Sequence, residues 1–276
     1  MTEFVGLPRT GPWLAVRDLS FFYGPSPVLT DLNLDFYPGR HYIIAGPNGA
    51  GKSTLLDLLA NLRKPAAGGI MVIGRPLAGL APAKLARIMA LAPQDVRLDF
   101  SFTVRQVTAM GRRPYQGRWG RLTPDDVVAV DRALAALNLL ELAEKPVTAL
   151  SGGEKRRVVA ARALAQETPV ILFDEPTAGL DVAQALALME LARRKADEGA
   201  LVITVSHDLN LASTRGHEFV FLKKGRLAAA GPTGQVFTGD VLGDVYEAAA
   251  RVMNDEFAGG LQAAFRPRES SNGRCG

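Results

Sequence analysis

The 276-residue chain contains 47% hydrophobic and 22% charged residues with a formal net charge of +4, which is typical of a folded globular protein and excludes disorder throughout. The charge is too small to imply a nucleic-acid partner by itself. A single cysteine, Cys275, excludes a disulfide framework, a cysteine metal cluster and a catalytic thiol. Met1–Arg9 lacks the features of a secretion signal and no run approaches 18 apolar residues, so we expect a cytosolic or membrane-peripheral chain.

The first part of the chain has the pattern of strands, a loop and a helix. Between residues 13 and 44, apolar and polar positions alternate between turn residues, which predicts short antiparallel strands ending in a buried strand at His41–Ala45. A glycine-rich loop follows directly. Ser53–Leu62 has helical periodicity, and Gly68–Ile73 returns to strand chemistry. The predicted order is therefore strand, loop, helix, strand.

Two very apolar segments in the second half predict the core of a doubly wound α/β fold. Val170–Phe173 and Leu201–Val205 bracket a predicted helix at Val182–Ala196, and such continuous apolar runs are typical of parallel strands covered on both faces. From about Ala83 to Leu150 the chain is rich in alanine, leucine and arginine at helical spacing. This composition predicts a helical lobe, at about residues 95–150, inserted into the core.

We expect one domain over residues 1–235, with a mainly parallel sheet, an N-terminal antiparallel β subdomain and the helical lobe. The pattern weakens beyond Gly231. Residues 236–276 are therefore predicted to be a C-terminal extension whose role is open. Its polar end, from about Arg266, is expected to be disordered.

The glycine-rich loop carries the strongest motif, G-x-x-x-x-G-K-[ST], between a predicted strand and a predicted helix. Glycines let backbone N–H groups face phosphate oxygens, the lysine reaches the β- and γ-phosphates, and the serine hydroxyl can ligate Mg²⁺. The alternative is a glycine turn with a surface lysine. The motif predicts a P-loop nucleotide-hydrolase core, with phosphate-binding residues Gly46, Pro47, Asn48, Gly49, Ala50, Gly51, Lys52, Ser53 and Thr54.

Two predicted core strands end in polar residues suited to phosphate chemistry. Asp174 and Glu175 follow the first apolar run, at the edge where a doubly wound sheet binds its ligand. Asp174 would hold the Mg²⁺ shell, and Glu175 would orient or deprotonate the attacking water. His207 follows the next strand and would face the γ-phosphate. Taken alone, the acidic pair fits a chance strand end, and the histidine fits a loop residue or helix cap.

A second candidate anion site lies at Leu150–Glu154. Ser151, Gly152 and Gly153 precede a predicted helix that continues to Ala165, so they occupy its positive end. One protomer has no evident need of two phosphate-binding sites. In a head-to-tail dimer, the site at Ser151–Gly153 would instead lie against the γ-phosphate bound by the phosphate loop of the other copy. A simple helix cap is the alternative.

With these motifs in order, the chain resembles ATP-binding-cassette ATPases over about residues 13–235. The resemblance implies ATP and Mg²⁺ as cofactors and a homodimer of ATPase subunits. It assigns Tyr23 to adenine stacking, Gln94 to sensing Mg²⁺ and water, Leu150–Glu154 to the family signature, Ala178–Asp181 to a loop across the dimer, and His207 to a switch histidine. A strand-end core aromatic is the alternative for Tyr23, and a solvated loop residue is the alternative for Gln94.

Two further features narrow the resemblance. Glu154 stands where many family members carry glutamine, and Thr103–Tyr115, above all Gly-Arg-Arg-Pro-Tyr, resembles importers of iron chelates (siderophores), haem and cobalamin. This implies that the lobe docks on integral-membrane permease subunits at the cytoplasmic face of the cell membrane. An extracytoplasmic binding protein would select the cargo and act on this chain indirectly.

Other functions remain as alternatives to an importer. Five arginines of the lobe would otherwise form a solvated basic face: Arg105, Arg112, Arg113, Arg118 and Arg121. With Tyr115 and Trp119 they would suit a soluble cassette ATPase acting on DNA or ribosomes. We expect no nucleic-acid partner, because neither a coiled-coil insertion nor a second phosphate loop is present. The sequence has no guanine-recognition motif, and neither a GTPase nor a small-molecule kinase would explain the signature. An exporter is disfavoured because no membrane span is fused to the ATPase.

Overall fold

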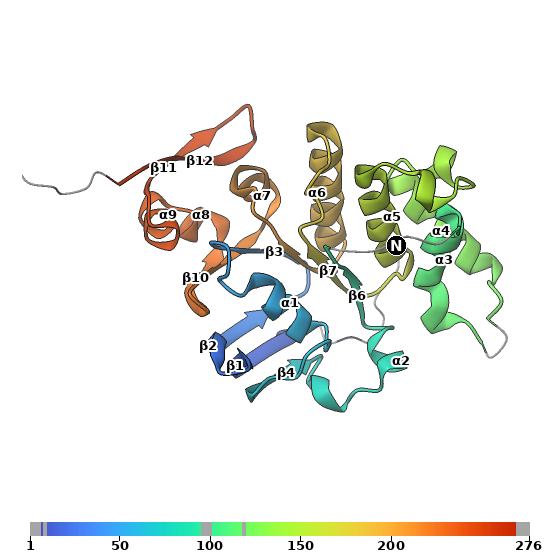
Figure 1. Cartoon of the computed structure of the whole chain (residues 1–276), viewed down its shortest axis with the longest axis horizontal. Helices are drawn as coiled ribbons and strands as arrows, with labels where there is room; N and C mark the ends of the chain where they lie inside the picture. The colour runs from blue at the N-terminus through green and yellow to red at the C-terminus, as the bar shows by residue number, and fades with distance from the viewer. Residues whose placement is uncertain (1–6, 8–9, 95–100, 118–119, 269–276) are drawn as a thin grey trace, which may run out of the picture.

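The computed structural model describes residue 7 and residues 10–94, 101–117 and 120–268 (Figure 1). Within them, a six-stranded sheet of order β10-β9-β3-β8-β7-β6 forms the core. Every neighbouring pair is parallel except β9 and β10. The strands are β3 (Arg40–Ala45), β6 (Met89–Ala92), β7 (Val170–Asp174), β8 (Leu201–Val205), β9 (Glu218–Lys223) and β10 (Arg226–Pro232).

A smaller antiparallel sheet packs beside the core, in the order β2-β1-β4-β5. Its strands are β1 (Leu14–Tyr23), β2 (Ser26–Phe36), β4 (Ala67–Val72) and β5 (Arg75–Pro76). The buried strand predicted at His41–Ala45 exists as β3, but it pairs in parallel with β8 and β9 and not with the antiparallel strands before it. The predicted fold class, an α/β core with an antiparallel β subdomain and helical elements, is confirmed.

Helix α1 (Lys52–Leu59) lies between the two sheets (Figure 1). Its buried leucines share one apolar core with β1, β2 and the inner residues of the parallel strands. The opposite side of the parallel sheet packs against α5 (Gly152–Ala165), α6 (Val182–Asp197) and α7 (Leu209–Arg215). Both faces of β7 and β8 are therefore covered, which explains why every residue of these strands is buried.

Short helices gather at one side of the core, where α3, α4 and α5 pack together (Figure 1). Capping boxes start all three, at Thr103, Thr123 and Ser151, and fix where each begins. The domain limits proposed from the sequence stay predictions. The helices on this side, besides α5, are α3 (Val104–Ala109), η2 (Met110–Tyr115), α4 (Pro124–Ala136), η3 (Leu140–Leu142) and η4 (Val147–Ala149). Two short helices, η1 (Leu77–Gly79) and α2 (Pro82–Leu85), lie between β5 and β6 in the chain, and η1 packs against β4.

The sequence prediction was wrong for Met89–Ala92, which falls in the segment expected to be helical from about Ala83. These residues form β6, because pairing with β7 overrides the helical preference of alanine, leucine and methionine.

Past β10 the chain forms α8 (Thr233–Val236), α9 (Gly239–Tyr246) and a C-terminal hairpin, β11 (Ala249–Asp255) and β12 (Gly260–Arg266). Most of the tail predicted to be disordered, residues 269–276, lies outside the described residues.

A buried histidine at the base of the core makes stability depend on pH. The His41 ring lies 2.8 Å from the Thr204 hydroxyl and 3.2 Å from the Arg215 carbonyl, and burial lowers the pKa of His41 from 6.5 to about 3. Between these pH values the unfolded chain binds a proton that the folded chain does not. The unfolding free energy should therefore fall by about 1.4 kcal/mol per pH unit on acidification in this window, from His41 alone.

Chemical denaturation across that pH window checks this expectation. The His41→Gln variant cannot take up the proton, so the slope of its unfolding free energy against pH should be shallower by one proton. Equal slopes in the variant and the unchanged chain would contradict the role of His41.

Candidate active site

The predicted phosphate loop joins β3 to α1 at the edge of the parallel sheet. Gly46 leaves β3 with φ of 146°, and a Cβ there would lie 2.1 Å from the Leu222 carbonyl oxygen, so only glycine fits. The Lys52 ammonium folds back on the loop and donates to the carbonyls of Gly46 at 2.8 Å and Pro47 at 2.9 Å. Burial lowers the pKa of Lys52. The loop thus holds a desolvated ammonium at the start of a helix, and the contact of Lys52 with phosphate oxygens stays a prediction.

Asp174 ends β7 next to this loop. The Ser53 hydroxyl donates to the Asp174 carboxylate at 3.2 Å, so two of the three predicted Mg²⁺ ligands are in contact. Burial raises the pKa of Asp174 to about 6, with a smaller contribution from the Glu175 charge. A cation between these oxygens would offset that cost, and hard oxygen donors are what Mg²⁺ prefers.

Glu175 lies where the three predicted catalytic residues meet. Its backbone is left-handed, with φ of 47°, which is an unusual conformation for this residue type. The Gln94 amide donates to one carboxylate oxygen at 3.0 Å, and His207 Nε2 lies 2.5 Å from the other. The ends of β6, β7 and β8 deliver these three side chains to one point, as parallel neighbouring strands do.

Ser151 and Glu154 explain the glutamate form of the signature. The Ser151 N–H and hydroxyl donate to the Glu154 carboxylate at 2.7 and 2.8 Å, and the Glu154 N–H donates to the Ser151 hydroxyl at 3.3 Å. These bonds lower the pKa of Glu154. A capping box takes glutamate or glutamine at this position. Ser151 therefore caps α5, with Gly152 and Gly153 at the positive helix end, and anion binding there stays a prediction.

The loop predicted to cross the dimer contacts the signature helix of its own chain. Arg156, which the sequence analysis did not single out, donates to the Ala178 carbonyl. Asp181 caps α6 by accepting from the Gln184 N–H at 2.8 Å. A pocket of about 180 Å³ opens beside these elements, between the catalytic and signature residues, and its lining includes Gln94, Gly152, Arg156, Asp174 and Glu175.

Tyr23 lies at the end of β1 with 45% of its surface exposed, so it is not the core aromatic that was the alternative. The Arg63 guanidinium lies 4.9 Å from the centre of its ring, and Phe21 packs edge-on at 5.0 Å. The exposed ring suits a stacking partner, and adenine stacking on Tyr23 stays a prediction. Arg63, which the sequence analysis missed, would border the same ligand.

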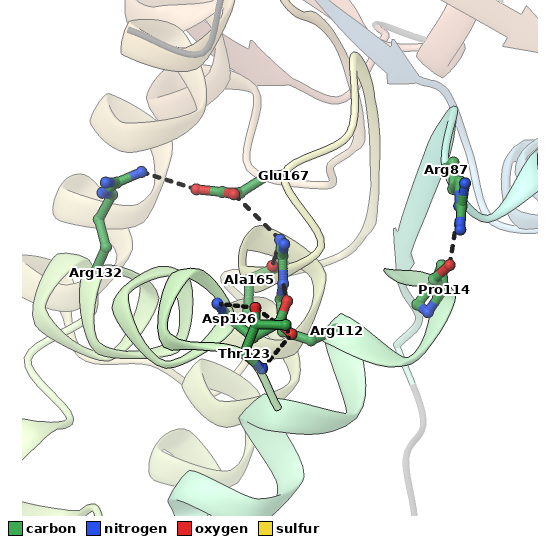
Figure 2. Close-up of polar contacts among 8 residues, drawn as sticks. All are labelled: Arg87, Arg112, Pro114, Thr123, Asp126, Arg132, Ala165 and Glu167. Atoms are coloured by element: carbon green, nitrogen blue, oxygen red, sulfur yellow. Dashed lines mark hydrogen bonds and ion pairs between the residues drawn. The ribbon is translucent and has the colours of Figure 1, made fainter. Parts of the chain in front are cut away.

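The Gly-Arg-Arg-Pro-Tyr segment is partly internal: Gly111 and Arg112 are buried, whereas Arg113 is exposed. Arg112 is 7% exposed and pairs with Asp126 at 2.7 Å and Glu167 at 3.1 Å (Figure 2). Its guanidinium also lies 4.3 Å from the centre of the Tyr115 ring. At Gly111 a Cβ would lie 2.1 Å from the Arg162 carbonyl oxygen of α5. The interpretation of Arg112 as part of a solvated basic face was therefore wrong, because Arg112 is buried and paired with two carboxylates. Arg118 and Trp119 lie outside the described residues.

Fold and site together define an ATP-hydrolysing P-loop protein of the cassette type. Residues 29–178, more than half of the chain, match the ABC transporter family, and the chain belongs to that family. The hemin import ATP-binding protein of Thermobifida fusca is 42% identical over 241 residues, covering 87% of this chain and 84% of that protein.

Solved structures of related ABC transporter chains have the same fold. A chain of an inward-facing ABC transporter of proposed metal-chelate type has a TM-score of 0.78 at 27% identity, covering 93% of this chain and 98% of that one. A cassette solved as a dimer in a post-hydrolysis state with ADP and Pi has a TM-score of 0.70 at 26% identity, covering 80% and 98%. This chain is thus an ATP-binding ATPase subunit. In the part of the chain that the structure describes, no helix is long and apolar enough to cross a membrane.

Proposed function

We propose that the chain energises uptake of a metal chelate, such as an iron-siderophore, haem or cobalamin, as the peripheral ATPase of an importer at the cytoplasmic face of the cell membrane. The observation that carries the ATPase chemistry is the junction of Gln94, Glu175 and His207 beside the phosphate loop. The importer assignment is supported by the names of the hemin import relative and the metal-chelate type transporter.

Two copies of the chain would bind two ATP molecules between them. Each ATP would lie between the loop at Lys52 of one copy and Ser151–Gly153 of the other. Support comes from the dimeric state of the related cassette with ADP and Pi and from the exposed N-terminal end of α5 at Ser151 and Gly152. Closure of the dimer would pull on permease subunits, with Asp181 and its loop at the interface. Hydrolysis would remove the charge that bridges the halves and let them part.

The site residues divide the chemistry of phosphoryl transfer. The loop from Gly46 to Thr54 would hold the phosphates, Glu175 would orient or deprotonate water, and His207 would steady the γ-phosphate. Ser53, Asp174 and Gln94 would hold Mg²⁺, which neutralises charge on the phosphate oxygens when bound. These hard oxygen donors fit Mg²⁺ better than a softer metal, which prefers nitrogen or sulfur ligands.

Lys52→Ala should weaken ATP binding by about 10- to 100-fold, because it removes a charge-assisted contact to phosphate. Isothermal titration with ATP measures the loss. The matched control is Lys64→Ala, which removes an exposed lysine from beyond the same helix and should bind ATP normally. Unchanged affinity in Lys52→Ala would count against its role in the loop.

ATP hydrolysis by the chain reconstituted with its permease in liposomes tests the importer assignment. Addition of binding protein loaded with chelate should raise the hydrolysis rate, and empty binding protein should not. A rate that ignores permease and loaded binding protein alike, or copurification only with ribosomes or DNA, would favour the soluble alternative. That alternative is disfavoured because Arg105 and Arg112 are held in ion pairs with carboxylates.

A further inference from the structure

The C-terminal hairpin is attached to α7 by a two-way amide pair. The side-chain carbonyl of Asn210 accepts a hydrogen bond from the Ala263 N–H at 2.7 Å, and its amide donates to the Ala263 carbonyl at 3.2 Å. Asn210 thus pairs with β12 much as a residue of a neighbouring strand would. Because both ends of the amide are used, neither alanine nor aspartate at this position would preserve the pair.

A second attachment lies one turn further along the same face of α7. The hydroxyl of Ser213, a buried residue, lies 2.5 Å from the Leu261 carbonyl oxygen there. In the first turn, the Gln262 side-chain amide also donates to the backbone carbonyl of Asn210 at 3.3 Å. Residues three apart share a helix face, so β12 holds one side of α7 over its length. Figure 1 shows the hairpin lying beside this helix. The attachment therefore restrains rotation of α7 about its axis.

Helix α7 begins at Leu209, two residues after His207. Asp208 caps the helix by accepting from the Leu211 N–H at 3.0 Å, and its own N–H donates to the Ser206 hydroxyl at 3.2 Å. His207 lies between these two anchored residues and reaches Glu175 at 2.5 Å. Asn210 is three residues away from His207, so a shift in the first turn of α7 would move the histidine against Glu175.

The same extension also reaches the phosphate loop. Tyr246, the last residue of α9, lies close to the backbone of Gly46 and packs edge-on against Phe265 of the hairpin at 5.7 Å. Lys223 of β9 donates to the Asp244 carbonyl at 2.7 Å. The segment after β10 therefore contacts both the first residue of the phosphate loop and the helix that follows His207.

We propose that the C-terminal hairpin, acting through Asn210 and α7, holds His207 in place against Glu175, and that Asn210 is a positioning residue for ATP hydrolysis. The proposal rests on the role proposed for His207. It gives residues 236–268 a task in the ATPase cycle: they keep the switch side chain aligned while the nucleotide is hydrolysed.

Kinetics of the full-length Asn210→Ala variant test the proposal. The kcat for hydrolysis should fall about tenfold with KM for ATP nearly unchanged, because misplacement of a group by a fraction of an ångström slows the chemical step more than binding. In a His207→Ala background the same substitution should cause no further loss. Met253→Ala, at an exposed position on β11, is the control within the hairpin and should hydrolyse ATP normally. Equal losses in both backgrounds would overturn the proposal.

Histidine side-chain NMR separates this proposal from the role of His207 in catalysis. The chain has three histidines. The His41 ring lies 3.2 Å from the Arg215 carbonyl at the far end of α7, and the His41 N–H donates to His217. In Asn210→Ala the ring resonances of His207 should shift or broaden while the other two stay in place. Unchanged His207 resonances, or equal shifts in all three, would refute the attachment even if His207 proves catalytic. Ser213→Ala, which removes one bond to β12, should give the same pattern more weakly and serves if Asn210→Ala does not fold.

Discussion

Replacement of Glu175 by glutamine is expected to stop ATP hydrolysis while leaving ATP binding intact. The amide has the shape of the carboxylate but cannot accept a proton from water, so the hydrolysis rate should fall by about 10²- to 10⁴-fold. Bound ATP would persist, and the two copies would stay associated around it. Hydrolysis assays, nucleotide titration and light scattering of the chain with ATP and Mg²⁺ measure the three consequences.

The surroundings of Glu175 make this substitution informative. One carboxylate oxygen accepts from Gln94 and the other faces His207, so the neutral variant keeps a partner for each side chain and should fold normally. Glu198→Gln removes a carboxylate paired with Lys195 at the end of α6 and should leave hydrolysis unchanged. Rapid turnover by Glu175→Gln would show that another group activates the water.

Motif-bearing segments could be predicted from the sequence because their signals are local. The apolar runs of β7 and β8 and the glycine spacing before α1 each lie within a few residues, and the structure contains all three elements. In contrast, β6 depends on a partner far along the chain. Met89–Ala92 is a strand because β7 pairs with it, and no pattern within four residues specifies that pairing.

The candidate site, like the fold, could be predicted from the sequence only in part. The sequence named Gln94, Glu175 and His207 separately, but their meeting at one carboxylate follows from the order of β6, β7 and β8 in the sheet. Asn210 and Tyr246 carry no motif, so their links to the site appear only once α7 and α9 are packed. The roles of the named residues stay predictions until the variants are measured.

Arg112 shows why charge patterns mislead in this lobe. Its sequence neighbours are arginines and a tyrosine, which suggested a basic surface. In the fold it donates to Asp126 of α4 and to the Ala165 carbonyl at the end of α5, at 2.7 and 2.9 Å (Figure 2). Arg132 reaches the other oxygen of Glu167 at 2.8 Å from the solvent side. The buried guanidinium of Arg112 therefore joins η2, α4 and the end of α5.

Substitution of Arg112 by methionine should lower the unfolding free energy by about 3 to 5 kcal/mol, because it leaves the Asp126 carboxylate buried without its cation. Chemical denaturation measures the loss. Arg132→Met breaks an exposed pair to Glu167 and should cost less than about 1 kcal/mol. Adding Asp126→Asn to Arg112→Met should recover part of the stability, since it removes the orphaned charge. Equal losses of unfolding free energy in Arg112→Met and Arg132→Met would mean that the buried ion pair of Arg112 does not stabilise the end of α5.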